Sequence, residues 1–130
     1  MPTSSVDILP TLIHLTGGEP PGWCEGQVLP AFGGADISDQ SLFMMEGRTN
    51  RAFQPLTRAT FALRKGQHKL IYYKGYEQYD RRDTFEMYDI DNDPGELNDL
   101  YSESLALAKD LRTELLARVE SENANFKGAG

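Results

Sequence analysis

The last third of the chain carries the clearest periodic pattern of apolar and polar positions. Between Ser102 and Glu122, apolar residues recur at intervals of three and four, with charged residues between them. The apolar positions that share this face are Leu105, Ala108, Leu111, Leu115, Leu116 and Val119. We predict a helix over 102–122, capped by Ser102 and frayed after Asn123, whose apolar face must cover another surface.

Four β-rich segments in the middle of the chain can form that surface. Residues 60–64 and 69–73 flank a short glycine-containing stretch, which predicts a hairpin. Residues 85–89 alternate apolar and polar positions, as an antiparallel partner of the hairpin would. Residues 41–46 form a mostly apolar run, which predicts a strand that is buried on both faces or lies at an interface.

The N-terminal segment predicts a second, shorter helix. Ser4 and Ser5 are suitable N-cap residues, and Gly17 can end the helix. Pro10 lies inside this segment, so we expect either a short 3₁₀ turn before the main helix or a kink. Its apolar stripe consists of Ile8, Leu9, Leu12, Ile13 and Leu15.

A glycine- and proline-rich stretch over residues 17–40 follows the first helix. This composition predicts an irregular surface loop, with room for a brief helical turn within 27–32. We expect Trp23, the single tryptophan, to pin this loop to the rest of the molecule.

These elements together predict an α+β fold. A small antiparallel sheet of about four strands is packed by a long C-terminal helix, and an N-terminal helix precedes it. A length of 130 residues suits one domain over residues 1–130.

Composition and charge narrow the class of partner. The net charge of -7 argues against a nucleic-acid partner, because such proteins need excess Lys and Arg to neutralise phosphates. We also expect no membrane span, because no apolar run approaches the roughly 18 residues that one requires. The basic residues gather between Arg48 and Arg82, which leaves open either a local site for a small anion or an ordinary solvated surface.

Several residue patterns with known chemistry are incomplete in this sequence. Asp89, Asp91 and Asp93 resemble the start of an EF-hand loop, but Pro94 stands where that loop needs glycine and Leu100 where it needs glutamate. We therefore interpret residues 89–95 as a strand that ends in a turn.

The reactive residue types are also few. Cys24, the only cysteine, has no positive neighbour in sequence that would activate it, so we expect an inert thiol and no metal site. His14 and His68 are the only histidines and read as packing or surface residues.

Tyrosines and basic residues are interleaved over residues 69–82. Such a pattern can stack on sugars or bases, or it can simply belong to a strand and its loop. The residues alone therefore predict an α+β domain and no particular chemistry.

Two longer segments resemble the sulfatase family. Ser5–Gly17 reads S-V-D-I-L-P-T-L-I-H-L-T-G and is similar to the family pattern S-x-V-D-I-x-P-T-L-L-x-L-x-G. Phe85–Leu100 reads F-E-M-Y-D-I-D-N-D-P-G-E-L-N-D-L and is similar to x-E-L-Y-D-L-x-x-D-P-x-E-x-x-N-L. Two shorter stretches lie between them: Ala62–Tyr72 resembles A-V-R-x-G-x-x-K-Y-I, and Gly26–Leu29 resembles G-x-S-L.

The resemblance covers nearly the whole chain and implies the C-terminal subdomain of a sulfatase. Sulfatases hydrolyse sulfate esters with a formylglycine, made from Cys or Ser in a C/S-x-P-x-R motif, beside a calcium ion. Cys24 begins C-E-G-Q-V and lacks the Pro and the Arg. We therefore expect no catalytic residue, metal ligand or cofactor in this chain, with calcium and formylglycine in an upstream alkaline-phosphatase-like domain.

On this interpretation, the partner of the chain is the sulfatase catalytic domain. Arg48, Arg64, His68 and Lys69 are the residues that we predict to lie near substrate, because they are polar groups beside loops and turns of a subdomain that borders the cleft. The alternatives are a stand-alone carbohydrate- or protein-binding module, and self-association through apolar surface such as Ile8, Leu12 and 42–45.

Overall fold

The computed structural model describes residues 3–36, 39–47 and 56–127. The chain forms two compact units, residues 1–42 and 43–130. The expectation of one domain over 1–130 stays a prediction.

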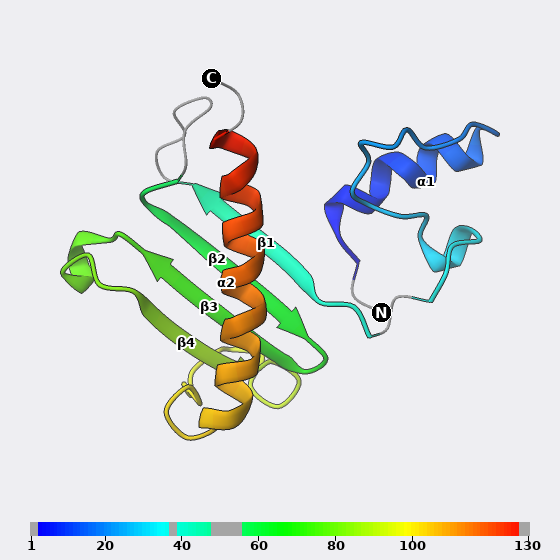
Figure 1. Cartoon of the computed structure of the whole chain (residues 1–130). Coiled ribbons are helices and arrows are strands. Elements are labelled where there is room, and N and C mark those ends of the chain that lie inside the picture. The colour runs from blue at the N-terminus through cyan, green and yellow to red at the C-terminus, as the bar shows by residue number, and fades with distance from the viewer. Residues whose placement is uncertain (1–2, 37–38, 48–55, 128–130) are drawn as a thin grey trace. The chain divides into compact units, whose positions relative to one another are not determined.

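A four-stranded antiparallel sheet and one long helix make up the second unit (Figure 1). The strands are β1 (Leu42–Gly47), β2 (Ala59–Lys65), β3 (His68–Lys74) and β4 (Thr84–Asp89), and they lie in the order of the sequence. The predicted α+β fold, with its sheet and its long C-terminal helix, is confirmed.

The hairpin of β2 and β3 is the centre of this sheet. Arg64 pairs with Lys69 and Lys65 with His68 across the two-residue turn, whose Gly66 adopts a left-handed φ of 57°. Glycine adopts such a φ without the steric cost that a Cβ brings. The turn therefore sets which side chains of β2 and β3 share a face.

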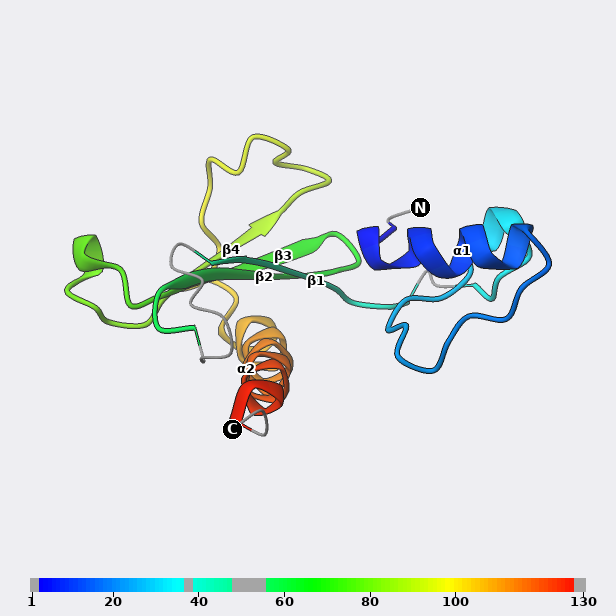
Figure 2. The same ribbon diagram turned by 90° about the horizontal axis from the view of Figure 1, so that it is seen from above.

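The core lies between the sheet and α2 (Leu105–Lys127), which packs on β2 and β3. In Figure 2, α2 covers one face of the sheet, and the segment after β4 projects from the other. The side chains at this contact are almost wholly buried: Phe61, Leu63, Leu70 and Met87 from the sheet and Leu115 from α2. Each fully buried side chain of this kind stabilises the fold by about 1.5–3 kcal/mol.

An aromatic row runs across the covered face of the sheet. Neighbouring ring centroids lie 4.6–6.1 Å apart in the order Phe43, Phe61, Tyr72, Phe85 and Tyr101. Offset stacking at such distances adds to the free energy gained by burial. The row joins all four strands and the segment before α2.

Helix α2 differs at both ends from the sequence-based prediction. It begins at Leu105, and the Ala108 amide donates to the Ser104 carbonyl at 2.9 Å, so the predicted cap at Ser102 is wrong. The amides of Glu103 and Ser104 instead donate to Leu100, which forms a turn ahead of the helix. The predicted fraying after Asn123 is also wrong: the helix continues to Lys127, and the Asn123 side chain accepts a hydrogen bond from the Leu56 amide at 3.2 Å.

Strand β1 does not have the predicted burial. Met44 and Met45 are 43% and 49% exposed, so the expectation of burial on both faces is wrong. Among the described elements, β1 is an edge strand next to β2, whereas α2 packs on β2 and β3. Exposure is compatible with the other half of that expectation, an interface.

The first unit contains the predicted N-terminal helix. A 3₁₀ turn over Ser5–Asp7 leads into α1 (Ile8–Leu15), and Gly17 follows with a left-handed φ of 78°. A second 3₁₀ turn, Pro30–Phe32, lies within the predicted loop. Trp23 is 71% exposed, so the prediction that it pins this loop is wrong.

Candidate functional site

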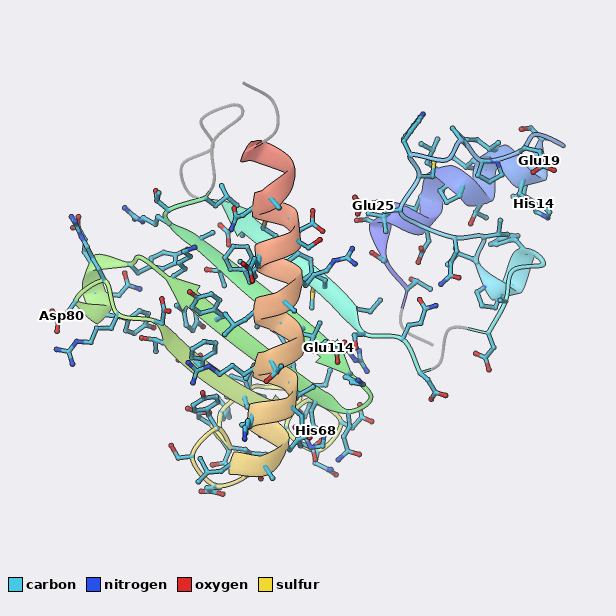
Figure 3. The ribbon with its side chains drawn as sticks, viewed as in Figure 1. His14, Glu19, Glu25, His68, Asp80 and Glu114 are labelled. Carbon is cyan, nitrogen blue, oxygen red and sulfur yellow. The ribbon has the colours of Figure 1, made fainter. Side chains whose placement is uncertain are left out.

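The structure separates the residues that we predicted to lie near substrate. Arg64 and Lys69 are directly opposed on β2 and β3, so their side chains share the sheet face that α2 leaves uncovered. His68, which is labelled in Figure 3, lies on the other face, next to the turn of the hairpin. Arg48 lies outside the described residues.

Arg64 and Lys69 are both paired with carboxylates from the segment after β4. Lys69 Nζ lies 2.8 Å and 2.9 Å from the two carboxylate oxygens of Glu96, and Arg64 Nη2 lies 3.7 Å from Asp91 Oδ1. Glu96 has a left-handed φ of 52°. The Lys69 pair is the shorter and less exposed of the two, so it holds this segment against the sheet.

A second polar group on the same face joins two tyrosines to one carboxylate. The hydroxyls of Tyr73 and Tyr88 donate to Glu86 Oε2 at 2.9 Å and 3.1 Å. Burial raises the pKa of the Tyr88 hydroxyl to about 12, and the negative charge of Glu86 adds to the shift. The pKa of Tyr73 is raised for the same two reasons. Both phenols are therefore neutral hydrogen-bond donors at neutral pH.

The carboxylates of Asp89 and Asp93 accept hydrogen bonds from the backbone around them. Asp89 Oδ1 accepts hydrogen bonds from the amides of Asp91 and Asn92, and Asp93 Oδ2 accepts from those of Leu97 and Asn98. Hydrogen bonds from Asn92 lower the pKa of Asp89. This is the turn that we predicted from the sequence.

Two observations bear on the calcium and formylglycine that the resemblance to sulfatases implies. Within residues 3–36, 39–47 and 56–127, no three Asp, Glu, His or Cys side chains are grouped so that they could hold a metal ion. Cys24 is half-buried, and its amide donates to the Pro21 carbonyl at 2.9 Å. Its sequence context lacks the Pro and Arg of a formylglycine motif.

Helix α1 leaves most of its large apolar side chains exposed, and its buried side includes a polar residue. Pro10 and Thr11 are buried, and the Thr11 hydroxyl donates to the Asp7 carbonyl at 2.7 Å and accepts from the Leu29 amide at 2.9 Å. The opposite side is exposed: Val6 50%, Ile8 55%, Leu9 44%, Leu12 56% and Leu15 55%.

Such exposure of an apolar stripe is unusual for a helix in water, where the apolar face is normally the covered one. Among the described residues, the buried members of both hydrophobic clusters lie between Leu56 and Val119, and the first unit contributes none. The exposed apolar residues Val6, Ile8, Leu9, Leu12 and Leu15 are therefore a candidate interaction surface. We call this surface the outer face of α1, although Val6 lies in the 3₁₀ turn just before the helix. The apolar stripe was visible in the sequence, but which side of the helix the chain itself covers was not.

No helix among the described residues combines the length and apolar character that crossing a membrane requires.

The fold of the chain is that of the C-terminal α+β part of sulfatases. The sequence profile of the family described as "N-sulphoglucosamine sulphohydrolase, C-terminal" matches residues 3–124. The chain belongs to this family. A search of curated protein sequences found no significant match.

Solved sulfatase structures share the fold. A protein from Bacteroides fragilis described as a sulfatase superposes with a TM-score of 0.68 at 21% identity, over 92% of this chain and 25% of that one. BT1596, a 2-O GAG sulfatase, gives a TM-score of 0.60 at 24% identity, over 92% of this chain and 26% of that one.

BT4656 was solved in complex with its substrate, D-glucosamine-2-N,6-O-disulfate. It gives a TM-score of 0.58 at 22% identity, over 95% of this chain and 24% of that one. The chain thus spans about a quarter of the length of the sulfatases that it matches.

Proposed function

We propose that this chain is the non-catalytic C-terminal part of a sulfatase, a hydrolase of sulfate esters, and that it supports the catalytic domain. The outer face of α1 carries this proposal. An apolar stripe whose members are 44–56% exposed is costly to leave in water, at about 25 cal/mol per Å² of apolar surface. A surface of this kind is suited to being covered by another folded part.

We propose the catalytic domain of the parent sulfatase as the part that covers it. The solved sulfatases are about four times as long as this chain, so most of each lies outside the matched region. The formylglycine and calcium of the family would belong to that larger part. There they would supply the nucleophile that attacks the sulfate ester and the positive charge that stabilises the sulfate group during its transfer.

The uncovered face of the sheet is our candidate for the side that borders the substrate. Arg64 and Lys69 lie there, whereas His68 lies on the α2 face and Arg48 outside the described residues. Arg64 pairs with Asp91 and Lys69 with Glu96. This pairing favours two cations that are held in place over a site that is free to bind a ligand. The substrate of BT4656, D-glucosamine-2-N,6-O-disulfate, and the description of BT1596 as a 2-O GAG sulfatase favour a sulfated sugar as the substrate of the parent enzyme.

The test compares this chain with a longer protein that restores the upstream region. Both are assayed with a chromogenic aryl sulfate in the presence of calcium. Turnover by the longer protein alone supports the proposal, and turnover by the 130 residues alone contradicts it.

The interface itself is tested by mixing this chain with a separately produced upstream part. Leu12→Asp places a charge on the outer face of α1 and should abolish co-elution. Glu19→Lys changes an exposed residue just after α1 and should leave co-elution unchanged. Light scattering distinguishes the two alternatives: a dimer of this chain that Leu12→Asp dissolves would favour self-association, and a stable monomer with no affinity for the upstream part would favour a stand-alone module.

A further inference from the structure

A concave region lies at the end of the sheet away from the β2–β3 turn, where the chain enters β2 and leaves β3. It is a cleft of about 500 Å³, a size within the range of roughly 300–1,000 Å³ typical of small-molecule sites. Its lining includes Arg58, Lys74, Gly75, Glu77, Arg81 and Asp83. In Figure 3, Asp80 marks the neighbouring turn, at the opposite end of the hairpin from His68.

The charge in this cleft differs in sign from that of the chain. Three cations and two carboxylates line it, whereas the chain as a whole has a net charge of -7. One of the carboxylates, Asp83, already accepts a hydrogen bond from the Tyr72 hydroxyl at 2.9 Å. The other, Glu77, pairs with Arg81 at 3.4 Å, and both side chains are about three-quarters exposed, so water screens this pair strongly.

Two of the cations have no carboxylate partner in the described part of the chain. The Arg58 guanidinium lies 5.4 Å from the centroid of the Tyr76 ring, which orients it while leaving its charge uncompensated. Lys74, half-buried at the end of β3, makes no ion pair with a described residue. The cleft therefore contains two basic groups, Arg58 and Lys74, that its own carboxylates do not pair with.

The backbone around the cleft is held in a strained conformation. Asp80 and Arg81 have consecutive left-handed φ values of 52° and 59°, although neither is glycine. The Arg81 amide donates to the Tyr76 carbonyl at 3.0 Å and so fixes this turn. Such strain persists only where the surroundings determine it, and it gathers at functional sites.

Gly75 is required for the close approach that forms one wall of the cleft. Its φ is 68°, and a Cβ built at this position would lie 2.1 Å from the Thr57 carbonyl oxygen. The end of β3 thus passes directly over the residues that lead into β2. This contact places Lys74 and Arg58 at the same opening.

We propose that this cleft binds the sulfate group of a sulfated sugar. Arg and Lys recognise tetrahedral oxyanions by charge-assisted hydrogen bonds, and a cleft of this volume has room for a sugar ring beside the group. The choice of sulfate, rather than another oxyanion, rests on the proposed function. The site is distinct from the predicted Arg64 and Lys69, which lie toward the other end of the same hairpin.

The test follows backbone amide shifts of this chain by NMR during three titrations, with glucosamine 6-sulfate, inorganic sulfate and unsulfated glucosamine. We expect saturable shifts at the amides of Gly75 and Arg81 with glucosamine 6-sulfate and none with glucosamine. Inorganic sulfate should shift the same amides with weaker affinity. Shifts that are equal for glucosamine and its sulfate, that lie elsewhere, or that never saturate would overturn the proposal.

Charge-removing variants complete the test. Lys74→Gln and Arg58→Gln should each raise the Kd for glucosamine 6-sulfate about tenfold, and the two together by more. Lys109→Gln removes the same charge from an exposed position on α2 and should leave the Kd unchanged. Unchanged binding by both cleft variants would overturn the proposal. Because binding is measured on this chain alone, its failure is separate from any failure to support a catalytic domain.

Discussion

Asp7 at the start of α1 accepts a hydrogen bond from the backbone amide of Gln27, twenty residues later, at 3.1 Å. The other carboxylate oxygen of Asp7 accepts from the Ser4 amide at 3.0 Å. One buried side chain thus both closes the capping box of the 3₁₀ turn before α1 and ties the following loop to that turn. The first unit is organised by polar contacts of this kind, since most of its large apolar side chains are exposed.

Replacing Asp7 should loosen the loop in the first unit. Asp7→Ala leaves the amides of Ser4 and Gln27, both half-buried, without their acceptor. The cost for each is below the roughly 1–3 kcal/mol of a fully buried unpaired donor, because water can reach these amides. The Gln27 amide should exchange its hydrogen about tenfold faster or more, as measured by NMR. Glu19→Ala, an exposed carboxylate just after the helix, serves as the control and should leave this rate unchanged.

The core beneath α2 should be far more sensitive than the solvent side of the same helix. Leu115 is fully buried, so Leu115→Ala should lower the free energy of unfolding by about 2–5 kcal/mol. Leu105 is 69% exposed, and Leu105→Ala should change it by less than about 0.5 kcal/mol. Urea unfolding followed by circular dichroism measures both, and equal losses would contradict the position of the core.

The two left-handed glycines of the hairpin region should respond differently to a methyl group. Gly66 has open space where a Cβ would stand, so Gly66→Ala should cost only the φ penalty of about 1 kcal/mol. Gly75→Ala should cost clearly more, because its Cβ would meet the Thr57 carbonyl. Thermal unfolding of the two variants checks this order, and the reverse order would contradict the close approach at Gly75.

The tyrosines on the uncovered sheet face should ionise late and destabilise the fold as they do so. Burial raises the pKa of Tyr88 to about 12 in the folded chain, against about 10 in the unfolded chain. A raised pKa favours the folded state while the phenol is neutral. This contribution is complete below about pH 10 and is lost as the pH rises toward 12.

A spectrophotometric titration of phenolate absorbance tests the Tyr88 assignment. Glu86→Gln removes the nearby negative charge and should lower the pKa of Tyr88, although burial should keep it above 10. Tyr88→Phe should remove one late-titrating group. Glu103→Gln, an exposed carboxylate before α2, should leave the titration unchanged.

Local signals in the sequence were sufficient for most of the fold. The hairpin was predicted within one residue at each end, because its β-branched and aromatic runs flank a turn containing Gly66. Helix α2 was predicted from its periodic core positions, but its first residue was misplaced by three because Ser102 and Ser104 are equally good caps in sequence terms. The hydrogen bonds to Leu100 distinguish them, and they require the folded turn.

Side-chain surroundings were less accessible from the sequence than the elements themselves. Arg64 and Lys69 were named as polar groups beside a turn, and only the register of β2 and β3 opposes them on one face. The cleft around Arg58 and Lys74 has no signal in sequence spacing beyond a general gathering of basic residues. Its shape depends on the contact between Gly75 and Thr57, which lie eighteen positions apart.

Periodicity, turn residues and composition were enough to establish an α+β unit with a long helix over a small sheet, because these patterns act over a few neighbouring residues. The edge position of β1, the carboxylate partners of the basic side chains and the outward apolar face of α1 were settled in three dimensions. Each depends on which distant segment of the chain packs beside a residue. The loop at Gln27 and Leu29 covers the side of α1 that carries Thr11, and the leucines of α1 are therefore left exposed.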